Sequence, residues 1–206
     1  MKKQLFSAVM LCTLGLVGCG DDQTGTPTPD TGPKYNTADK INTYLEGKTL
    51  TMTGANIPSH PNGYNEDVNY GSATQCYQST TMQVAAGVYN VTSVLGTLRD
   101  APQPGNTGTC DHDTKSTELK FSTTAVLIEN VATDGSCFDV TYTYTGFKQA
   151  GRGQISQDGS TAKLELFFEG QATGNRCANG AVGSATVTLN GQPFTGNAVQ
   201  VYTISQ

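Results

Sequence analysis

The sequence offers few residues that could act as a catalytic base. Only two histidines, His60 and His112, occur among its 206 residues, and a serine or cysteine nucleophile needs a histidine beside it. Neither the Gly-x-Ser-x-Gly elbow of serine hydrolases nor a P-loop is present. Gly151-Arg152-Gly153 lacks the third glycine of a dinucleotide fingerprint, and we interpret it as a kink at a strand edge. We therefore expect a protein that is not an enzyme.

The acidic residues around His112 could bind a metal ion. Asp111, Asp113 and Glu118 supply carboxylates near that imidazole, and Asp111-x-Asp113 begins like a calcium-binding loop. However, Lys115 stands where such a loop places another oxygen ligand, and the loop's glycine is missing. We interpret the segment as a solvated loop beside a disulfide, and we expect no metal and no other cofactor.

A long loop is expected from Asn56 to Gly71, because this stretch is rich in turn-forming residues. It carries His60, Tyr64 and Tyr70, and tyrosine is an amphipathic residue that suits contact surfaces. Long ordered loops of compact domains are often functional. The loop is therefore a candidate recognition surface for a protein or a glycan, and a rim loop without a special role is the alternative.

Four apolar and aromatic residues, Phe138, Val140, Tyr142 and Tyr144, alternate with polar ones and so share one face of an expected strand. Buried tyrosine hydroxyls need hydrogen-bond partners. We consider two interpretations of this face, ordinary core packing and the lining of a ligand pocket inside a barrel.

The first residues have the pattern of an export signal. Lys2 and Lys3 precede an uncharged, largely apolar run that is too short to span a bilayer as a helix, which needs about 20 residues. The run ends in Leu16-Val17-Gly18-Cys19, which resembles the lipobox of bacterial lipoproteins. The resemblance implies that residues 1–18 are removed and that Cys19 becomes the acylated first residue. A conventional signal peptide or a membrane-anchoring helix is the alternative.

Residues 19–34 are interpreted as the acylated cysteine followed by a flexible tether, since they contain prolines, glycines and no large apolar side chain. In bacterial lipoproteins an aspartate directly after the cysteine tends to mean retention in the inner membrane. Gly20 stands there in this sequence. The resemblance therefore implies the cell envelope, with the outer membrane favoured. Because Asp21 and Asp22 follow, and acidic residues there mark surface export in some lineages, the periplasmic and the surface face both stay open.

Removal of Cys12 and acylation of Cys19 would leave four cysteines, which are Cys76, Cys110, Cys137 and Cys177. An even number in an oxidising compartment predicts two disulfides. We favour Cys76 with Cys110 and Cys137 with Cys177, because sequential partners close shorter loops; the two other pairings remain open.

The charge of the mature chain argues against one class of partner. The expected signal holds two basic and no acidic residues, so the mature chain has ten basic and seventeen acidic residues, a net charge of −7. An acidic domain without a basic run is not expected to bind nucleic acid.

Residues 35–206 are expected to form a single all-β domain with one short N-terminal helix. The helix is predicted after Asn36 or Thr37 as cap and before Gly47. Beyond it, apolar residues alternate with polar ones in several runs, and Asp134-Gly135 and Asp158-Gly159 mark hairpin turns. Eight to ten antiparallel strands fit an up-and-down barrel, with a β-sandwich as the alternative.

A short helix followed by a meandering barrel resembles the lipocalin or calycin arrangement. The Gly-x-Trp signature of lipocalins is absent, because the chain has no tryptophan, and Leu45-Glu46-Gly47-Lys48-Thr49 occupies its place. Two functions follow. The first is a non-enzymatic structural, interaction or binding module held on the membrane by Cys19. The second, implied by the resemblance, is a lipocalin-like carrier of a small apolar ligand.

Overall fold

The computed structural model describes residues 32–57, 76–99, 108–194 and 197–206. Every element described below belongs to one compact unit of the chain, Pro33–Gln206. Within the described residues, no helix has the length and the apolar character needed to cross a membrane.

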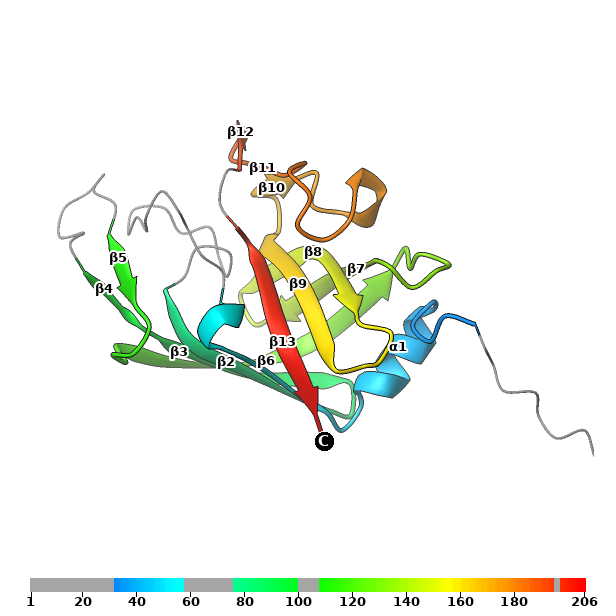
Figure 1. Ribbon diagram of the computed structural model, residues 1–206, viewed down its shortest axis with the longest axis horizontal. Coiled ribbons are helices and arrows are strands. Elements are labelled where there is room, and N and C mark those ends of the chain that lie inside the picture. The colour runs from blue at the N-terminus through cyan, green and yellow to red at the C-terminus, as the bar shows by residue number, and fades with distance from the viewer. Residues whose placement is uncertain (1–31, 58–75, 100–107, 195–196) are drawn as a thin grey trace, which may run out of the picture. The chain divides into compact units, whose positions relative to one another are not determined.

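Eight strands form a closed antiparallel barrel (Figure 1). They are β1 (Thr49–Thr53), β2 (Tyr77–Ala85), β3 (Val88–Leu95), β6 (Thr117–Glu129), β7 (Phe138–Tyr144), β8 (Phe147–Ile155), β9 (Thr161–Phe168) and β13 (Val199–Ser205). Each pairs with the next along the chain, and β13 pairs with β1 to close the ring. Closure removes the free strand edges that an open sheet would expose. The predicted up-and-down barrel is thus confirmed, and the sandwich alternative is wrong.

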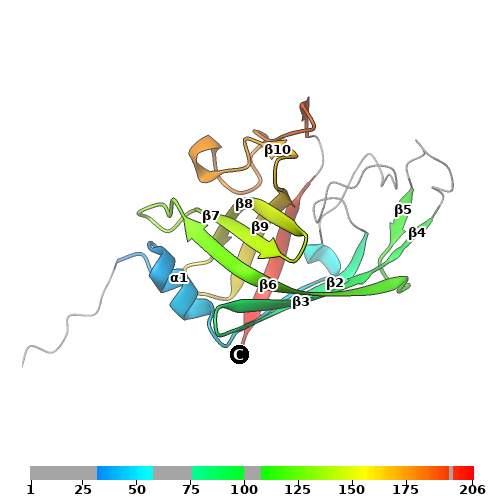
Figure 2. The same cartoon turned by 180° about the vertical axis from the view of Figure 1, so that it is seen from behind.

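Two insertions interrupt the meander at the same end of the barrel. Between β3 and β6 the chain forms a hairpin of β4 (Thr97–Arg99) and β5 (Thr109–Asp111). Between β9 and β13 it forms β10 (Ala172–Thr173), the 3-10 turn η3 (Cys177–Asn179), β11 (Thr188–Leu189) and β12 (Gln192–Pro193). Figures 1 and 2 both show β4 and β5 extending away from the barrel on the side opposite the helix. We call this end of the barrel the open end.

The other end is closed by α1 (Ala38–Leu45). Thr37 caps the helix by accepting a hydrogen bond from the Lys40 amide, as its position before the amphipathic run predicts. Ile41 and Leu45, one turn apart, are buried against the barrel core. Tyr44 donates a 2.7 Å hydrogen bond to the carbonyl of Gly159 in the β8–β9 turn, which ties the helix to this end.

The alternation of the strands places one face of each inside the barrel. Phe138, Val140 and Tyr142 of β7 are buried there, in one core cluster with Leu164 and Leu166 of β9. The interpretation of Gly151-Arg152-Gly153 as a strand-edge kink is wrong, since these residues lie within β8. A Cβ atom at position 153 would lie 2.6 Å from the Phe138 ring, so this glycine leaves room for the aromatic side chain.

The segment from residue 170 to 194, here called the outer segment, covers the outer face of β7, β8 and β9. Its Val187 and Leu189 are buried against Phe167, which points outward from β9. Arg176 donates hydrogen bonds to the carbonyls of Val140 on β7 and Gly151 on β8. The barrel wall is therefore two layers thick on this side.

Candidate functional site

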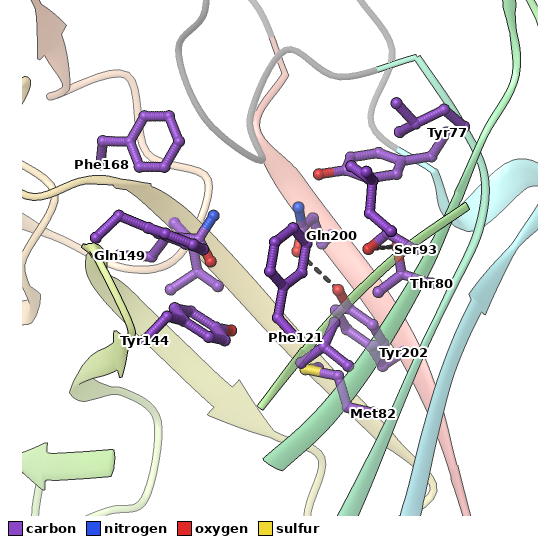
Figure 3. Close-up of a pocket in the computed structure, with 15 residues that line it drawn as sticks. Tyr77, Thr80, Met82, Ser93, Phe121, Tyr144, Gln149, Phe168, Gln200 and Tyr202 are labelled. Atoms are coloured by element: carbon purple, nitrogen blue, oxygen red, sulfur yellow. Dashed lines mark hydrogen bonds between the residues drawn. The ribbon is translucent and has the colours of Figure 1, made fainter. Parts of the chain in front are cut away.

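A cavity of about 100 Å³ lies inside the barrel at its open end (Figure 3). Seven of the eight barrel strands contribute to its wall. Counted along each strand from the open end, the first side chains that line the cavity are Tyr77, Leu95, Leu119, Tyr144, Phe147 and Phe168. The next positions along these strands place Thr80, Ser93, Phe121, Gln149 and Leu166 around the cavity. Met82, Val91, Gln200 and Tyr202 complete it.

Hydrogen-bonding groups enter the cavity from several sides. Figure 3 shows the hydroxyls of Tyr77 and Tyr144 directed into it from opposite walls, with the Gln149 side chain beside Tyr144. To the residues that the structure describes, these three side chains make no hydrogen bond. Their donors and acceptors are therefore available to a bound molecule.

Two further polar pairs line the same space. The hydroxyls of Thr80 and Ser93, which face each other across β2 and β3, lie 3.2 Å apart. The hydroxyl of Tyr202 donates a 2.8 Å hydrogen bond to Oε1 of Gln200 (Figure 3). The Thr80–Ser93 contact uses one of its two hydroxyl protons, so the second proton can be donated to a bound molecule.

The cavity wall carries no charged side chain among the residues described. Burial raises the pKa of Tyr77, Tyr144 and Tyr202 above 10, and the neighbouring tyrosines add to the shift at Tyr77 and Tyr202. These hydroxyls are therefore neutral at physiological pH, and those of Tyr77 and Tyr144 can both donate and accept. Such a wall suits an uncharged molecule, because nothing in it would compensate the desolvation of an ion.

Aromatic rings gather where the cavity meets the open end. The ring of Tyr144 stacks on Phe147 at a centroid distance of 4.6 Å. Phe121 and Phe168 approach Phe147 edge-on at 5.5 Å and 5.7 Å. Edge-to-face and stacked contacts of this kind are favourable and hold the rings in defined orientations. The entrance is therefore an ordered aromatic rim.

The four residues expected to line a pocket are only partly brought together around this cavity. Tyr144 borders it, whereas Phe138, Val140 and Tyr142 lie in the packed core nearer the closed end. The ring of Tyr142 packs 5.2 Å from that of Tyr89. These three residues therefore pack in the core and do not line the cavity.

Sequence reasoning missed the polar members of the wall. Thr80 shares its strand face with Met82 and Val84, and Gln200 shares one with Tyr202 and Ile204. A polar residue at an inward position of an apolar series was the available signal. It could have marked Thr80, Ser93, Gln149 and Gln200 as candidates.

Both predicted disulfides are confirmed. Cys76, just before β2, is bonded to Cys110 in β5. Cys137, just before β7, is bonded to Cys177 at the start of η3. The first disulfide joins the β4–β5 hairpin to the barrel, and the second joins the outer segment to it.

The acidic residues near His112 take structural roles. Asp111 is ion-paired with Arg99, which, with a hydrogen bond from Thr114, lowers its pKa to about 2. Glu118 pairs with two lysines, 115 and 120, and its pKa is also lowered to about 2. Nδ1 of His112 lies 2.5 Å from the carbonyl oxygen of Tyr77. Among the described residues, no group of histidine, cysteine and acidic side chains could hold a metal ion.

The remaining predicted site residues cannot be placed. Cys19 and the loop residues His60, Tyr64 and Tyr70 lie outside the described residues. Their expected roles in lipidation and recognition stay predictions.

Comparisons with known proteins do not identify the chain. No protein-family model, curated protein or solved structure matches it.

Proposed function

We propose that this protein is a non-enzymatic ligand-binding module of the bacterial cell envelope. In this proposal the barrel takes up a small uncharged molecule through its open end. The observation that carries the proposal is the cavity, with its uncharged, hydrogen-bonding wall at one end of a barrel whose other end is closed by α1. Largely apolar concave sites with a few convergent polar groups are the usual form of small-molecule sites.

The size of the cavity limits what it can enclose. Pockets for drug-sized ligands measure about 300–1,000 Å³, whereas an engineered cavity of about 150 Å³ accommodates benzene. A cavity of about 100 Å³ matches one small ring, or the end of a longer molecule whose remainder stays outside. The proposal therefore departs from an apolar lipocalin cargo in both size and polarity.

The location of the protein is proposed from its first residues. Acylation of Cys19 would attach it to the membrane, with the outer membrane favoured. Radiolabelled palmitate should label the wild-type chain and a Cys12→Ala variant, but not Cys19→Ala. Labelling of Cys19→Ala would contradict the proposed anchor.

The alternative of an interaction module that binds an envelope protein or a glycan relies on His60, Tyr64 and Tyr70. Since these residues lie outside the described part of the chain, no observation favours it over the cavity.

Two neighbouring substitutions on β3 test the function. Ser93 points into the cavity and Thr92 points outward, so Ser93→Phe fills the site while Thr92→Phe adds the same ring on the outer surface. Uncharged compounds of up to ten heavy atoms are screened by ligand-observed NMR against the wild-type protein and both variants.

We expect compounds that bind the wild-type protein and Thr92→Phe, but lose binding to Ser93→Phe. Circular dichroism checks that both variants keep the β-barrel fold. If no compound binds the wild-type protein, or if Ser93→Phe binds every compound unchanged, the proposed function is wrong.

A further inference from the structure

Resting on the proposed function, we infer that the cavity selects a single aromatic ring that carries an uncharged hydrogen-bonding group, as in the phenol class. The inference follows from how two kinds of group are arranged around one small space. The aromatic side chains form its rim, and the hydrogen-bonding groups lie within reach of a ring that has passed this rim.

The rim favours a flat aromatic molecule. Phe121, Tyr144 and Phe147 present faces and edges whose positions are fixed by their mutual contacts. An aromatic guest can adopt the same stacked or edge-on geometry, which stabilises aromatic pairs beyond the burial of their area. Beyond the rim, Met82, Val91 and Leu166 supply apolar contacts for the ring itself.

The polar groups favour a ring with a hydrogen-bonding substituent. The hydroxyls of Tyr77 and Tyr144 and the amide of Gln149 converge on the cavity from different strands. A purely apolar guest would displace water from these groups and leave them without partners. Sites built to hydrogen-bond a ligand discriminate strongly against analogues that lack the bonding group.

The same wall disfavours ions. The charged residues beside the rim in sequence are paired on the outside of the barrel. Lys148 pairs with Glu169 at 3.4 Å and Lys120 with Glu118 at 3.0 Å. A carboxylate or ammonium ion in the cavity would lose its hydration without gaining a counter-charge, which is costly. Neutral hydroxyl and carboxamide groups are the substituents that meet both conditions.

Three rings of nearly equal size test the inference on the full chain. Phenol has the hydroxyl, toluene lacks it, and benzoate carries a charge at pH 7. Competition by ligand-observed NMR should rank phenol about tenfold tighter than toluene, as expected when the hydrogen bonds of one hydroxyl are lost, with benzoate weaker still. Cyclohexanol, which keeps the hydroxyl but lacks the aromatic ring, should bind more weakly than phenol.

Gln149→Leu removes the amide group from the cavity wall and keeps a side chain of similar volume. Gln154→Leu is the matched control, because residue 154 lies on the same strand with the opposite, outward parity. We expect Gln149→Leu to lower the affinity for phenol about two- to tenfold while toluene binds at least as well, and Gln154→Leu to leave both affinities unchanged.

The possible outcomes separate the two proposals. Equal binding of phenol and toluene, or tighter binding of cyclohexanol than of phenol, would overturn the inferred ligand class while Ser93→Phe still blocks binding. If Ser93→Phe blocks the binding of no compound, the proposed function is wrong as well.

Discussion

At the scale of single residues, the least expected feature is a charged pair buried in the barrel wall. Arg152 is fully buried, and its Nε donates a 2.6 Å hydrogen bond to Oε2 of Glu165 on the next strand. Its Nη1 and Nη2 also donate to the carbonyls of Gly180 and Ser184 in the outer segment. The glutamate accepts a further bond from the amide of Gly183. The pair therefore binds the outer segment to the barrel.

Removing one partner of this pair should be strongly destabilising. Arg152→Met would leave the Glu165 carboxylate buried without its counter-charge, which typically costs about 3–5 kcal/mol. Equilibrium urea unfolding with the disulfides intact measures the free energy of unfolding. The double variant Arg152→Met, Glu165→Met should lose less stability than the single variant, since no unpaired charge stays buried.

The exposed pair provides the control. Lys148 and Glu169 are about half exposed, and Lys148→Met should change the free energy of unfolding little. A loss at Arg152→Met no larger than that at Lys148→Met would show that the buried pair does not stabilise the fold.

At the scale of elements, each inserted segment is held by one disulfide. The Cys137–Cys177 bond closes a separation of 40 residues and the Cys76–Cys110 bond one of 34. In the chain-entropy model the two bonds should stabilise the fold similarly, by about 4 kcal/mol each. Their local effects should differ, because they attach different segments.

Hydrogen exchange on two double variants tests this separation. In Cys137→Ser, Cys177→Ser, amides of the outer segment should exchange faster, while those of β4 and β5 keep the wild-type rate. In Cys76→Ser, Cys110→Ser the pattern should be reversed, because local opening follows the contacts that are lost. Equal acceleration in both segments for either variant would contradict independent attachment.

At the scale of the whole molecule, several tyrosines are buried together in the barrel interior. Burial raises the pKa of Tyr77, Tyr89, Tyr142, Tyr144 and Tyr202 above the ordinary value of 10. In the unfolded chain these groups lose their protons near pH 10, whereas in the barrel they keep them. Above about pH 10 the folded state thus binds more protons than the unfolded state, and stability falls as the pH rises.

The predicted result is cooperative alkaline unfolding. Tyrosinate absorbance of the buried tyrosines should rise together with the loss of the β-sheet circular dichroism signal above about pH 10. Below that pH this contribution to stability should be constant. Complete tyrosine titration near pH 10 with an unchanged circular dichroism spectrum would contradict the buried positions.

The sequence by itself determined the all-β class of the fold and its helix, and it favoured the disulfide pairing that the structure has. Two-residue alternation, as in Phe138 to Tyr144, reports which side chains face inward, and Thr37 marks the helix start. These signals are local, and the favoured disulfide pairing joined sequential cysteines. They could therefore be predicted without knowing which distant strands meet.

Only the tertiary structure decided where the interior is empty and what the outer wall buries. Alternation gives the face of a side chain but not its depth, so it could not distinguish Tyr144 at the cavity from Tyr142 in the core. The cavity arises because side chains from seven strands, Tyr77 to Tyr202, fill the open end incompletely. Arg152 is likewise buried only because the outer segment folds over it, a contact that no local pattern encodes.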